Sequence, residues 1–447
     1  MTEAIIRGQP ESDNPALRLL RRLIDVSPAE LPALGWCWLY IFSVLASYYI
    51  LRPIRDQMGV AGGVNNLPWL FTGTLVVMLM LNVPFSALVK LLPRKQFIPL
   101  SYRFFAFSIL AFGVAMYAVP AQHVVWVGRF FFIWISVFNL FVVSIFWSMV
   151  VDIFSSEQGK RLFGFVAVGA TLGAMAGAAI TGSLARHVPP MPLLIGAALL
   201  LEVAVFAVGR LAGLSPVLHY LPPTGPGEKL AERPVGGSVV AGIGHALGSP
   251  YLLNVSGFLL LYAITSTFLY FQQADIVSHS FTDRGAQTQF FATIDFSVNT
   301  LTLIFQLFLT GRIVLLLGVP LALSIVPVLT MIGFGALALA PTLAAVAVFQ
   351  VARRAGEYAI ARPTREVLFT VLPREDRYKS KGFIDTVVYR LGDQIGAWST
   401  VLLGALGTGI APLAAIGFAA LWLVSGLWLG RRQRVLEAAL APAPAGE

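Results

Sequence analysis

Arginines and carboxylates recur inside long apolar stretches of this sequence, where an ionised side chain is costly unless it has a partner or faces water. The stretch QVARRAGEYAIARPTREVLF, which begins at Gln350, holds four arginines and two glutamates. If it is helical, Arg354, Tyr358 and Arg365 share one face. The surplus of arginine predicts an anion-binding site, because a guanidinium group binds carboxylate or phosphate through two parallel hydrogen bonds.

Local pairing is expected to neutralise part of this charge. Arg354 can pair with Glu357, and Arg362 with Glu366, at spacings of three and four residues. Such salt bridges would hold the molecule in one conformation. Pro363 is expected to kink the helix and to release backbone carbonyls that could serve a ligand.

The first apolar stretch carries a second group of candidates. Residues at helical spacings of four and three form one stripe, comprising Tyr40, Val44, Tyr48, Arg52 and Arg55. Pro53 is predicted to interrupt this helix between the two cations, and Asp56 lies beside them as a neutralising partner. We expect the arginines at the mouth of a central cavity. The alternative is that they extend to the membrane surface as interfacial cations.

Carboxylates elsewhere in apolar stretches could titrate and couple a process to protons, whereas pairing with arginine would keep them ionised. Asp295 is the best candidate for titration, because no cation lies near it in the sequence. The penultimate stretch adds Asp385, Tyr389, Arg390 and Asp393. Tyr389 and Asp393 are one helical turn apart, so they are expected on the same face.

These considerations give two predicted sets of site residues. The anion-binding set comprises Trp36, Tyr48, Arg52, Arg55, Asp56, Arg354, Glu357, Tyr358, Arg365, Tyr389 and Asp393. The coupling or gating set comprises Arg129, Asp152, Glu157, Lys160, Arg161, Asp295 and Arg390. The five histidines have no metal-ligand spacing, and neither HExxH nor GxSxG occurs. We therefore expect no metal, no cofactor and no enzyme activity.

The composition requires most of the chain to lie in lipid. Of its 447 residues, 57% are hydrophobic and only 12% are charged, and the mean hydropathy is +0.78, outside the range of ordinary soluble domains. A spanning helix needs roughly 20 apolar residues, because every backbone polar group must be paired within it. The single cysteine, Cys37, excludes an intramolecular disulfide. Glu202 is interpreted as a buried, hydrogen-bonded or interfacial carboxylate rather than as a site residue.

The apolar runs predict an all-α membrane protein with twelve transmembrane helices in two six-helix halves. The predicted segments are 33–51, 67–89, 97–119, 124–151, 161–183, 191–212, 250–273, 287–310, 317–340, 342–371, 382–404 and 410–430. The chain then divides into an N-terminal segment 1–32, a half 33–212, a polar Pro/Gly-rich linker 213–249, a half 250–430 and a tail 431–447.

Lysine and arginine are concentrated in alternate loops, which predicts that both termini are cytoplasmic and that the protein lies in the cell's inner membrane. The loop near Lys90, Arg94 and Lys95 is typical of the cationic side, whereas Arg186 and Arg284 are the main cations opposite. The net charge of +9 is therefore largely a topology signal. Nucleic acid is not expected as a partner.

The sequence contains an internal repeat. Matches at a separation of 218 residues (375 − 157) comprise Glu157 with Glu375, Gly164 with Gly382, and Arg94 with Arg312. The same offset aligns SYYILRPIRD, from Ser47, with TSTFLYFQQA, from Thr265. Two parallel halves related by an axis normal to the membrane resemble the duplicated architecture of the major facilitator transporters. We expect a monomer.

Three glycines at four-residue spacing, Gly169, Gly173 and Gly177, mark one face of the fifth predicted helix. Small residues at this spacing favour close packing of two helices. The same face could instead be a sliding surface between the two halves.

Two motifs resemble those of the ATP:ADP antiporter family of bacterial and plastid nucleotide carriers, and a weaker likeness covers about 33–430. The family's Leu-Arg-x-x-Lys-Asp pattern corresponds to Leu51, Arg52, Arg55 and Asp56. Its Phe-Trp, Glu and Lys-Arg-Phe arrangement corresponds to Phe146, Trp147, Glu157, Lys160 and Arg161. The chain departs from the family at two positions. Arg55 replaces the lysine, and a glutamate expected near Ile135 is absent, with Asn139 the nearest polar residue.

The resemblance implies a secondary-active, alternating-access transporter of an anionic metabolite, with ATP/ADP-type exchange as the first substrate hypothesis. The partners would be this small anion and the lipid bilayer. One alternative is a proton-coupled importer or exporter of another organic solute. An alternative from another class is a membrane sensor or scaffold that transports nothing, although such a protein has no need to bury so many charges.

Overall fold

The structure is a computed structural model, and it describes residues 26–27, 30–154, 156–219, 249–372, 380–407 and 409–440, apart from a few side chains within them. All regular structure in these residues is helical, with no strand among them. The prediction of an all-α fold is confirmed. The linker and both terminal segments of the predicted division lie mostly outside the described residues.

Six long helices form the N-terminal half. They are α2 (Leu31–Ala61), α3 (Leu67–Leu91), α4 (Arg94–Ala118), α5 (Val124–Ile153), α6 (Ser156–Leu184) and α7 (Pro190–His219), with 3₁₀ turns η1 (Val64–Asn66) and η2 (Ala121–His123). Each is long enough and apolar enough to cross a membrane. α7 extends past the predicted end of its segment at 212.

The C-terminal half contains six helical rods in the described residues. Four are single spans, α9 (Pro250–Ser280), α10 (Arg284–Phe308), α11 (Thr310–Leu339) and α16 (Ile410–Leu440). The fifth joins α12 (Leu343–Gly356), the π-helix η4 (Glu357–Ala361) and α13 (Arg362–Leu368). The sixth joins the π-helix η5 (Ile384–Val388) and α15 (Tyr389–Leu406). The charged rods are thus the two that contain a π-helical turn.

The ends of several helices are fixed by side chains that cap them. Asp283 accepts a hydrogen bond from the backbone N–H of Ala286 at the start of α10, and Thr342 accepts one from Ala345 at the start of α12. α2 runs without a break through Pro53, so the predicted interruption there is wrong. Flanking helices α6 and α7 pack along α2, and such packing lets a membrane helix tolerate an internal proline.

Each half has its own apolar core. Tyr40, Phe138 and Phe146 are fully buried in the N-terminal half, and Phe258 and Trp422 in the C-terminal half. A third cluster draws on both halves and includes Val60, Leu67, Phe132, Phe271 and Phe291. The halves are therefore joined by apolar packing at one level of the molecule.

The predicted glycine stripe packs α6 against α2. A Cβ added at Gly173 would lie 2.3 Å from the carbonyl oxygen of Phe42, and one at Gly177 would lie 2.3 Å from that of Ala46. At Gly169 the added atom would meet the side chain of Trp38 at 2.8 Å. The stripe therefore serves close packing inside the N-terminal half.

The same contact recurs in the C-terminal half. A Cβ at Gly392 of α15 would lie 3.0 Å from the carbonyl oxygen of Leu260 in α9, and one at Gly396 would lie 3.0 Å from that of Ile264. Both halves thus bring a glycine-bearing helix against the first helix of the half.

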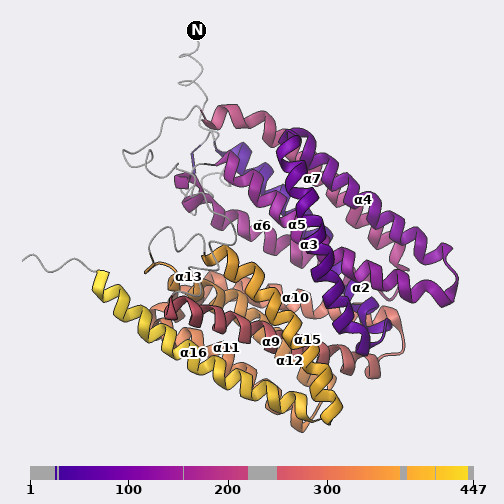
Figure 1. The fold of residues 1–447 in the computed structure, drawn as a ribbon. Helices are drawn as coiled ribbons and strands as arrows, with labels where there is room; N and C mark the ends of the chain where they lie inside the picture. The colour runs from indigo at the N-terminus through magenta and orange to yellow at the C-terminus, as the bar shows by residue number, and fades with distance from the viewer. Residues whose placement is uncertain are drawn as a thin grey trace, which may run out of the picture.

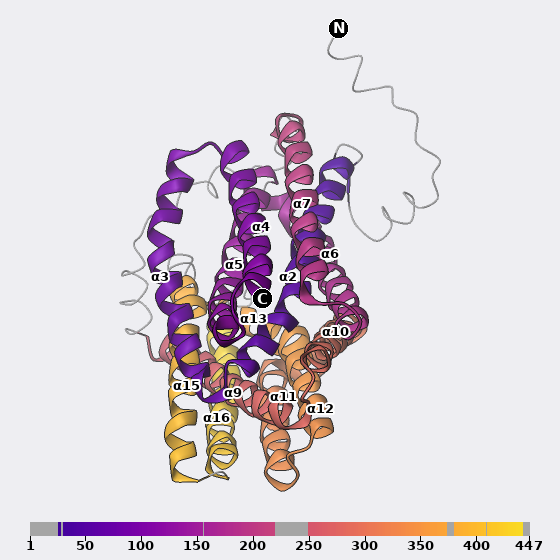
Figure 2. The same ribbon diagram turned by 90° about the vertical axis from the view of Figure 1, so that its right-hand side faces the viewer.

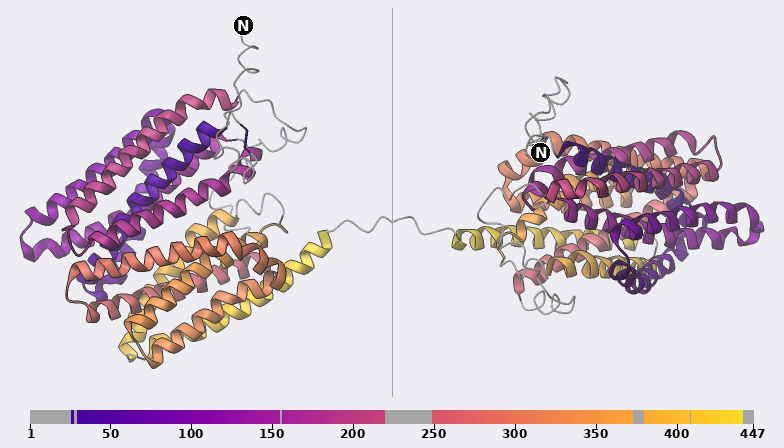
Figure 3. Two further views of the ribbon diagram at one scale, coloured as in Figure 1. Left: turned by 180° about the vertical axis from the view of Figure 1, so that it is seen from behind. Right: turned by 90° about the horizontal axis from the view of Figure 1, so that it is seen from above.

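The two halves lie side by side and converge toward one end. We call the side on which α7 and α16 end the terminal side. Figure 1 shows the halves separating toward the terminal side and meeting at the opposite end, near the end of α2. The perpendicular view in Figure 2 and the views in Figure 3 show the same arrangement of two helical bundles.

Candidate functional site

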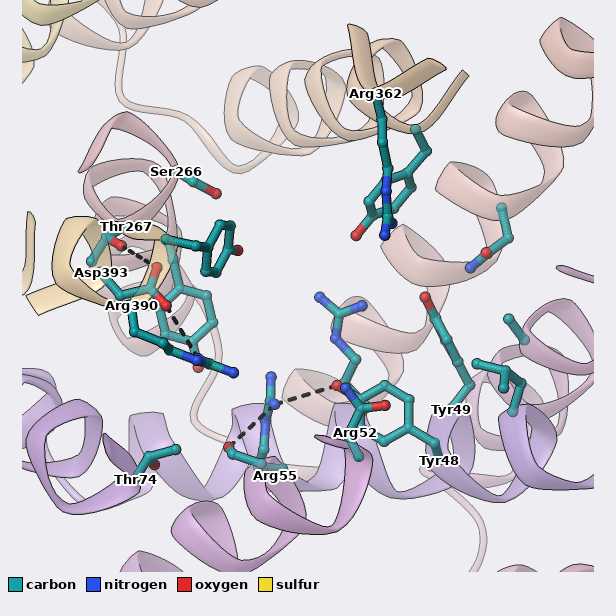
Figure 4. A pocket seen from close by; sticks show the side chains of 18 of the residues that line it. Tyr48, Tyr49, Arg52, Arg55, Thr74, Ser266, Thr267, Arg362, Arg390 and Asp393 are labelled. Atoms are coloured by element: carbon teal, nitrogen blue, oxygen red, sulfur yellow. Dashed lines mark hydrogen bonds and ion pairs between the residues drawn. The ribbon is translucent and has the colours of Figure 1, made fainter. Parts of the chain in front are cut away.

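A cavity of about 750 Å³ lies between the halves. Its polar and aromatic lining includes Tyr48, Tyr49, Arg52, Arg55, Phe71, Thr74, Phe132, Ser136, Asn139, Thr171, Ser266, Thr267, Tyr270, Asn299, Thr302, Gln306, Tyr358, Arg362, Glu366, Tyr389, Arg390, Asp393 and Gln394. Figure 4 shows these walls, with α2 along one side and Arg362 extending from the other. Four arginines and two carboxylates are among the lining residues.

The internal repeat places equivalent positions of α2 and α9 on this lining. Tyr48, Tyr49 and Arg52 line the cavity, and so do the residues 218 positions later, Ser266, Thr267 and Tyr270. At one pair of equivalent positions, the N-terminal half thus has a cation, Arg52, and the C-terminal half has a tyrosine, Tyr270.

A three-residue ion network joins the halves behind the lining. Asp295 Oδ1 in α10 forms ion pairs with Arg52 Nη1 of α2 at 3.3 Å and with Arg354 Nη1 of α12 at 2.7 Å. The carboxylate is buried, and its Oδ2 atom has no hydrogen-bond partner among the described residues. The same is true of Arg52 Nε and Arg354 Nη2, although Arg52 Nε lies 3.9 Å from Asp56 Oδ2. No cation lies near Asp295 in the sequence, but the fold brings in two arginines that are distant along the chain.

Arg55 and Asp56 form a second network on the same helix. Arg55 donates to Asp56 Oδ1 at 2.9 and 2.6 Å, and its Nη1 also approaches Tyr48 Oη at 3.5 Å and Ser136 Oγ at 3.4 Å. Tyr270 of the C-terminal half donates to the same Asp56 oxygen at 3.1 Å. Asp56 therefore links an arginine of the cavity to the opposite half.

The wall made by α9 and α15 carries a third charged group. Arg390 Nη1 lies 3.2 Å from Asp393 Oδ2, and Thr267 Oγ1 donates to the other oxygen of Asp393 at 3.4 Å. Figure 4 shows this group on the side of the cavity opposite Tyr48 and Tyr49. The buried carboxylate thus faces the cavity with a single arginine partner in the described residues.

The π-helix η4 changes the face that the charged rod presents. A π-helical turn contains one residue more than an α-helical turn, so residues beyond it are rotated relative to a regular helix. Tyr358, Arg362 and Glu366 consequently line the cavity. Arg365, predicted on that face, is buried instead between Glu357 at 3.5 Å and Asp385 at 3.7 Å. Neither Arg365 nor Glu357 lines the cavity.

The predicted local salt bridges of this rod do not form. Glu366 pairs with Lys381, and no carboxylate in the described part of the chain lies within ion-pair distance of Arg362. The carbonyl that Pro363 releases, that of Ala359, accepts a hydrogen bond from Thr310 Oγ1 at 2.8 Å. It is therefore not available to a ligand, contrary to expectation.

Polar contacts seal the cavity on the side away from the termini. Gln57 Nε2 approaches Gln287 Oε1 at 3.5 Å, and Gln289 donates to the carbonyl of Gly182 at 2.9 Å. Thr72 of α3 contacts Gln394 and Trp398 of α15 at 2.9 and 3.2 Å, and Trp398 also meets Trp69 edge to face. On the terminal side, by contrast, Arg362 and Glu366 are exposed.

Several predicted residues lie elsewhere. Trp36 packs against Phe206 of α7 and does not line the cavity. Arg129 donates to the carbonyl of Gly62 at 3.0 Å and stacks over Trp126. Arg161 pairs with Glu30 at 3.1 Å, within the N-terminal half. The side chains of three others, Asp152, Glu157 and Lys160, lie outside the described residues.

The described residues contain no group of three or more His, Cys, Asp or Glu side chains that could hold a metal ion. The chemistry available at the cavity is therefore that of guanidinium, carboxylate, hydroxyl and aromatic groups. Such a lining can bind a charged organic molecule and orient it by hydrogen bonds.

Comparison with solved structures decides the fold. A bacterial homologue of the human lysosomal transporter Spinster, solved inward-facing and unoccupied, matches with a TM-score of 0.59 at 12% identity and covers 94% of this chain and 100% of that one. A POT family peptide transporter matches with a TM-score of 0.56 at 12% identity, covering 93% and 98%. The E. coli fucose:proton symporter matches at 0.52 and 16%, covering 91% and 99%.

The chain has the major facilitator fold. No family model and no curated protein sequence matches it. The major facilitator fold predicted from the repeat is thus confirmed, whereas membership of the ATP:ADP antiporter family has no support from these comparisons. The major facilitator arrangement also accounts for a central cavity between two halves of six helices.

Sequence reasoning missed several lining residues. The sequence predicts a salt bridge between Arg362 and Glu366, whereas both residues line the cavity. Tyr49 and Tyr270 also line it. The repeat contained a usable signal for Tyr270, since it occupies the position equivalent to Arg52, 218 residues later.

Proposed function

We propose that this chain is a secondary-active, alternating-access transporter of a small anionic metabolite. The observation that carries the proposal is the lining itself, in which Arg52, Arg55, Arg362 and Arg390 outnumber two carboxylates. Arg362 has no ion-pair partner in the described residues, so its guanidinium is available to a ligand. An anion bound there would contact cations of both halves.

Nucleotides and related phosphates are the first substrate candidates. Their support comes from the Leu51 to Asp56 motif, and from tyrosine rings on the lining that offer faces for a base. The neighbours of the same fold are described as handling other molecules: one is a peptide transporter, one a fucose symporter, and another POT family transporter was solved with 5-aminolevulinic acid. The substrate panel must therefore include organic acids and peptides.

Asp295 supplies a mechanism that links binding to movement. It holds Arg52 of one half and Arg354 of the other, so it acts as a resident anion when no substrate is bound. An entering anion competes for the same guanidinium groups and weakens the contact between the halves. A ligand that binds two conformations unequally shifts their populations, as alternating access requires.

We also propose that the terminal side is cytoplasmic and that the protein lies in the inner membrane of the cell. The support is the concentration of lysine and arginine in loops on that side. Because polar contacts close the opposite side, the conformation described is then open to the cytoplasm.

The first experiment measures thermal stabilisation of the purified protein by ATP, ADP, inorganic phosphate, organic acids and a dipeptide. A ligand that binds the native state at a hundred times its Kd adds about 2.7 kcal/mol of stability. We expect an anion to raise the melting temperature of the wild type, and Arg362→Ala to weaken this effect.

Arg312→Ala is the matched control, because Arg312 is exposed on α11 and does not line the cavity. It removes the same charge and should leave the ligand effect intact. The proposal fails if no anion stabilises the wild type, or if the two variants lose the effect equally. A response to an anion other than a nucleotide keeps the mechanism and removes the nucleotide hypothesis.

Proton-coupled transport of another organic solute is the second candidate, and Asp393 favours it. This buried carboxylate lines the cavity and has one arginine partner in the described residues. In proteoliposomes, Asp393→Asn should abolish uptake driven by a pH gradient and leave exchange of internal for external substrate. Equal losses of both activities would count against proton coupling through Asp393.

A further inference from the structure

An ion pair lies on the outer surface of the N-terminal half. Arg103 Nε of α4 is 3.3 Å from both carboxylate oxygens of Glu202 in α7. Their side chains are 62% and 46% exposed, and neither residue lines the cavity. Figure 1 shows α4 and α7 side by side on the outer flank of this half.

The pair lies at bilayer depth. At 1.5 Å per residue, Arg103 lies about 22 Å along α4 from the end away from the termini, and Glu202 about 18 Å along α7 from the same end. The hydrocarbon core is about 30 Å thick. The backbone positions of both residues therefore lie within the spans Gln96–Ala118 and Pro190–Leu214, at depths that differ by about 4 Å.

The surroundings of the pair are apolar. Phe104 and Phe107 of α4 and Leu199 and Phe206 of α7 are each more than half exposed. These side chains suit lipid, whereas an ionised pair does not, because charged groups at this depth are costly and almost always face protein. Something other than lipid tails is therefore required against this face.

We propose that the outer face of α4 and α7 binds a second copy of this chain. The face carries one cation and one anion at nearly equal depth. A two-fold axis normal to the membrane preserves depth, so it brings Arg103 opposite Glu202 of the partner subunit, and Glu202 opposite the other arginine. The four charges form one network shielded from lipid by the apolar residues around it.

Charge complementarity selects this occupant. A face with charge of a single sign would repel its own copy, whereas this one is complementary to itself. The interface lies opposite the side of the N-terminal half that meets the C-terminal half, so a dimer leaves the cavity open. The inference replaces the monomer expected from the sequence. Glu202 is hydrogen-bonded to Arg103 of its own chain and is 46% exposed rather than buried, and the dimer would add a second arginine beside it.

The first test is disulfide crosslinking in native membranes. Cys37 is buried, and replacing it in Cys37→Ser leaves a background without cysteine. Leu199→Cys on that background should give a covalent dimer on oxidation. Ile332→Cys is the control, because Ile332 is similarly exposed, at 64% against 61%, but lies on α11 of the other half. It should remain monomeric.

The second test reverses charge. Glu202→Arg places like charges across the interface and should lower the dimer fraction in lipid nanodiscs at least tenfold. Adding Arg103→Glu restores opposite charges and should restore the dimer. The anion-induced thermal shift, which depends on the cavity, should persist in both variants, so this result is separable from the proposed function.

Three outcomes would overturn the inference. One is that the wild type is monomeric in nanodiscs and the Leu199→Cys variant gives no covalent dimer. Another is equal crosslinking through Ile332→Cys. The last is a covalent product whose mass shows a different protein, because the occupant would then not be a second copy. If Glu202→Arg does not fold, the crosslinking experiment alone decides.

Discussion

Individual buried charges in this molecule have two kinds of environment. Arg365 lies between two carboxylates, and Arg353 is held by hydrogen bonds to Thr330 and Thr265 and by the ring of Tyr262. Both have protein partners, as a buried cation must, although Arg365 Nε makes no hydrogen bond within the described residues. The Arg52–Asp295–Arg354 network differs, because one carboxylate is shared by an arginine from each half. Arg52 also lines the cavity, whereas Arg353 and Arg365 do not, so a ligand in the cavity can contact this network.

Replacing Asp295 tests this asymmetry. Asp295→Asn removes the resident anion and frees both guanidinium groups, so affinity for an anionic substrate should rise, by about tenfold for a gain of 1.4 kcal/mol. Equilibrium binding to the purified protein measures it. Arg52→Ala should act in the opposite direction. An unchanged or lower affinity in Asp295→Asn would contradict the resident-anion mechanism.

A second carboxylate, Glu30, lies just before the first membrane span. It accepts from Ser27 N at 2.9 Å and Gln158 Nε2 at 2.8 Å, and Arg161 Nη2 lies 3.1 Å away. Burial tends to raise the pKa of Glu30, but these hydrogen bonds and the charge of Arg161 outweigh it and hold the pKa below its usual value. The ionised form is thus stabilised by folding.

The sign of the pH effect follows from linkage. A depressed pKa contributes stability that is present above the usual pKa of glutamate and is lost as pH falls through the lowered value. Wild type should therefore melt at a higher temperature than Glu30→Gln at pH 7, and the gap should close as pH falls below about 4.5. A difference in melting temperature that stays constant with pH would show that the substitution does not act through the charge of Glu30.

At the scale of elements, long apolar runs were sufficient to predict the rods, because a spanning helix must be apolar over its whole length. The helix faces were harder to predict. In the rod from Leu343 to Leu368, the π-helical turn displaced the predicted face, so Arg365 is buried and Arg362 lines the cavity. Nothing in residue spacing reveals such a turn. The π-helical turn depends on contacts with neighbouring helices. One such contact is the hydrogen bond that Thr310 Oγ1 donates to the carbonyl of Ala359.

Close packing of α6 on α2 makes a matched pair of substitutions informative. Gly173→Ala would push a methyl group to 2.3 Å from the backbone of Phe42, so the helices must separate. Overpacking of this kind costs roughly 1–3 kcal/mol. Gly164→Ala, on the same helix with nothing within 4 Å, should be neutral or stabilising, because alanine favours helix by up to about 1 kcal/mol. Melting temperatures distinguish the two variants. Equal effects of Gly173→Ala and Gly164→Ala would contradict close packing of α6 on α2 at Gly173.

At the scale of the whole molecule, the cavity exists because the halves meet at one end only. The twofold repeat in the sequence predicted two similar halves, and the fold comparison bears this out. The contacts that close one side could not be predicted, since pairs such as Thr72 with Gln394 join residues far apart in the chain. The cavity is therefore a property of one conformation. The sequence predicts the two halves that form its walls, but it does not predict which end is closed.

Weakening the closed side should shift the conformational equilibrium. Gln57→Ala with Thr72→Ala removes polar contacts between the halves, each worth about 0.5–1.5 kcal/mol. The state open on the opposite side should gain population. A cysteine at the cavity, Thr171→Cys on the Cys37→Ser background, should then react several-fold more slowly with a thiol reagent applied from the terminal side.

Ser183→Ala is the control for this experiment, because within the described residues the Ser183 hydroxyl bonds only to carbonyls of its own helix. It should leave the labelling rate unchanged. Equal slowing by the control, or faster labelling in the double variant, would show that these contacts do not hold the closed side.

The offset of the internal repeat changes by one residue across the π-helix η5. Before it, the repeat holds at 218 residues, so that Phe42 and Ala46 correspond to Leu260 and Ile264. After it, the glycines that make the same contacts, Gly173 and Gly392, are 219 apart. The widened turn of η5 accommodates one additional residue, so the flanking helices make the same contacts in both halves. An ungapped alignment of the halves would therefore match Gly173 to the exposed Leu391, and every comparison of paired positions in α15 would then be wrong by one residue.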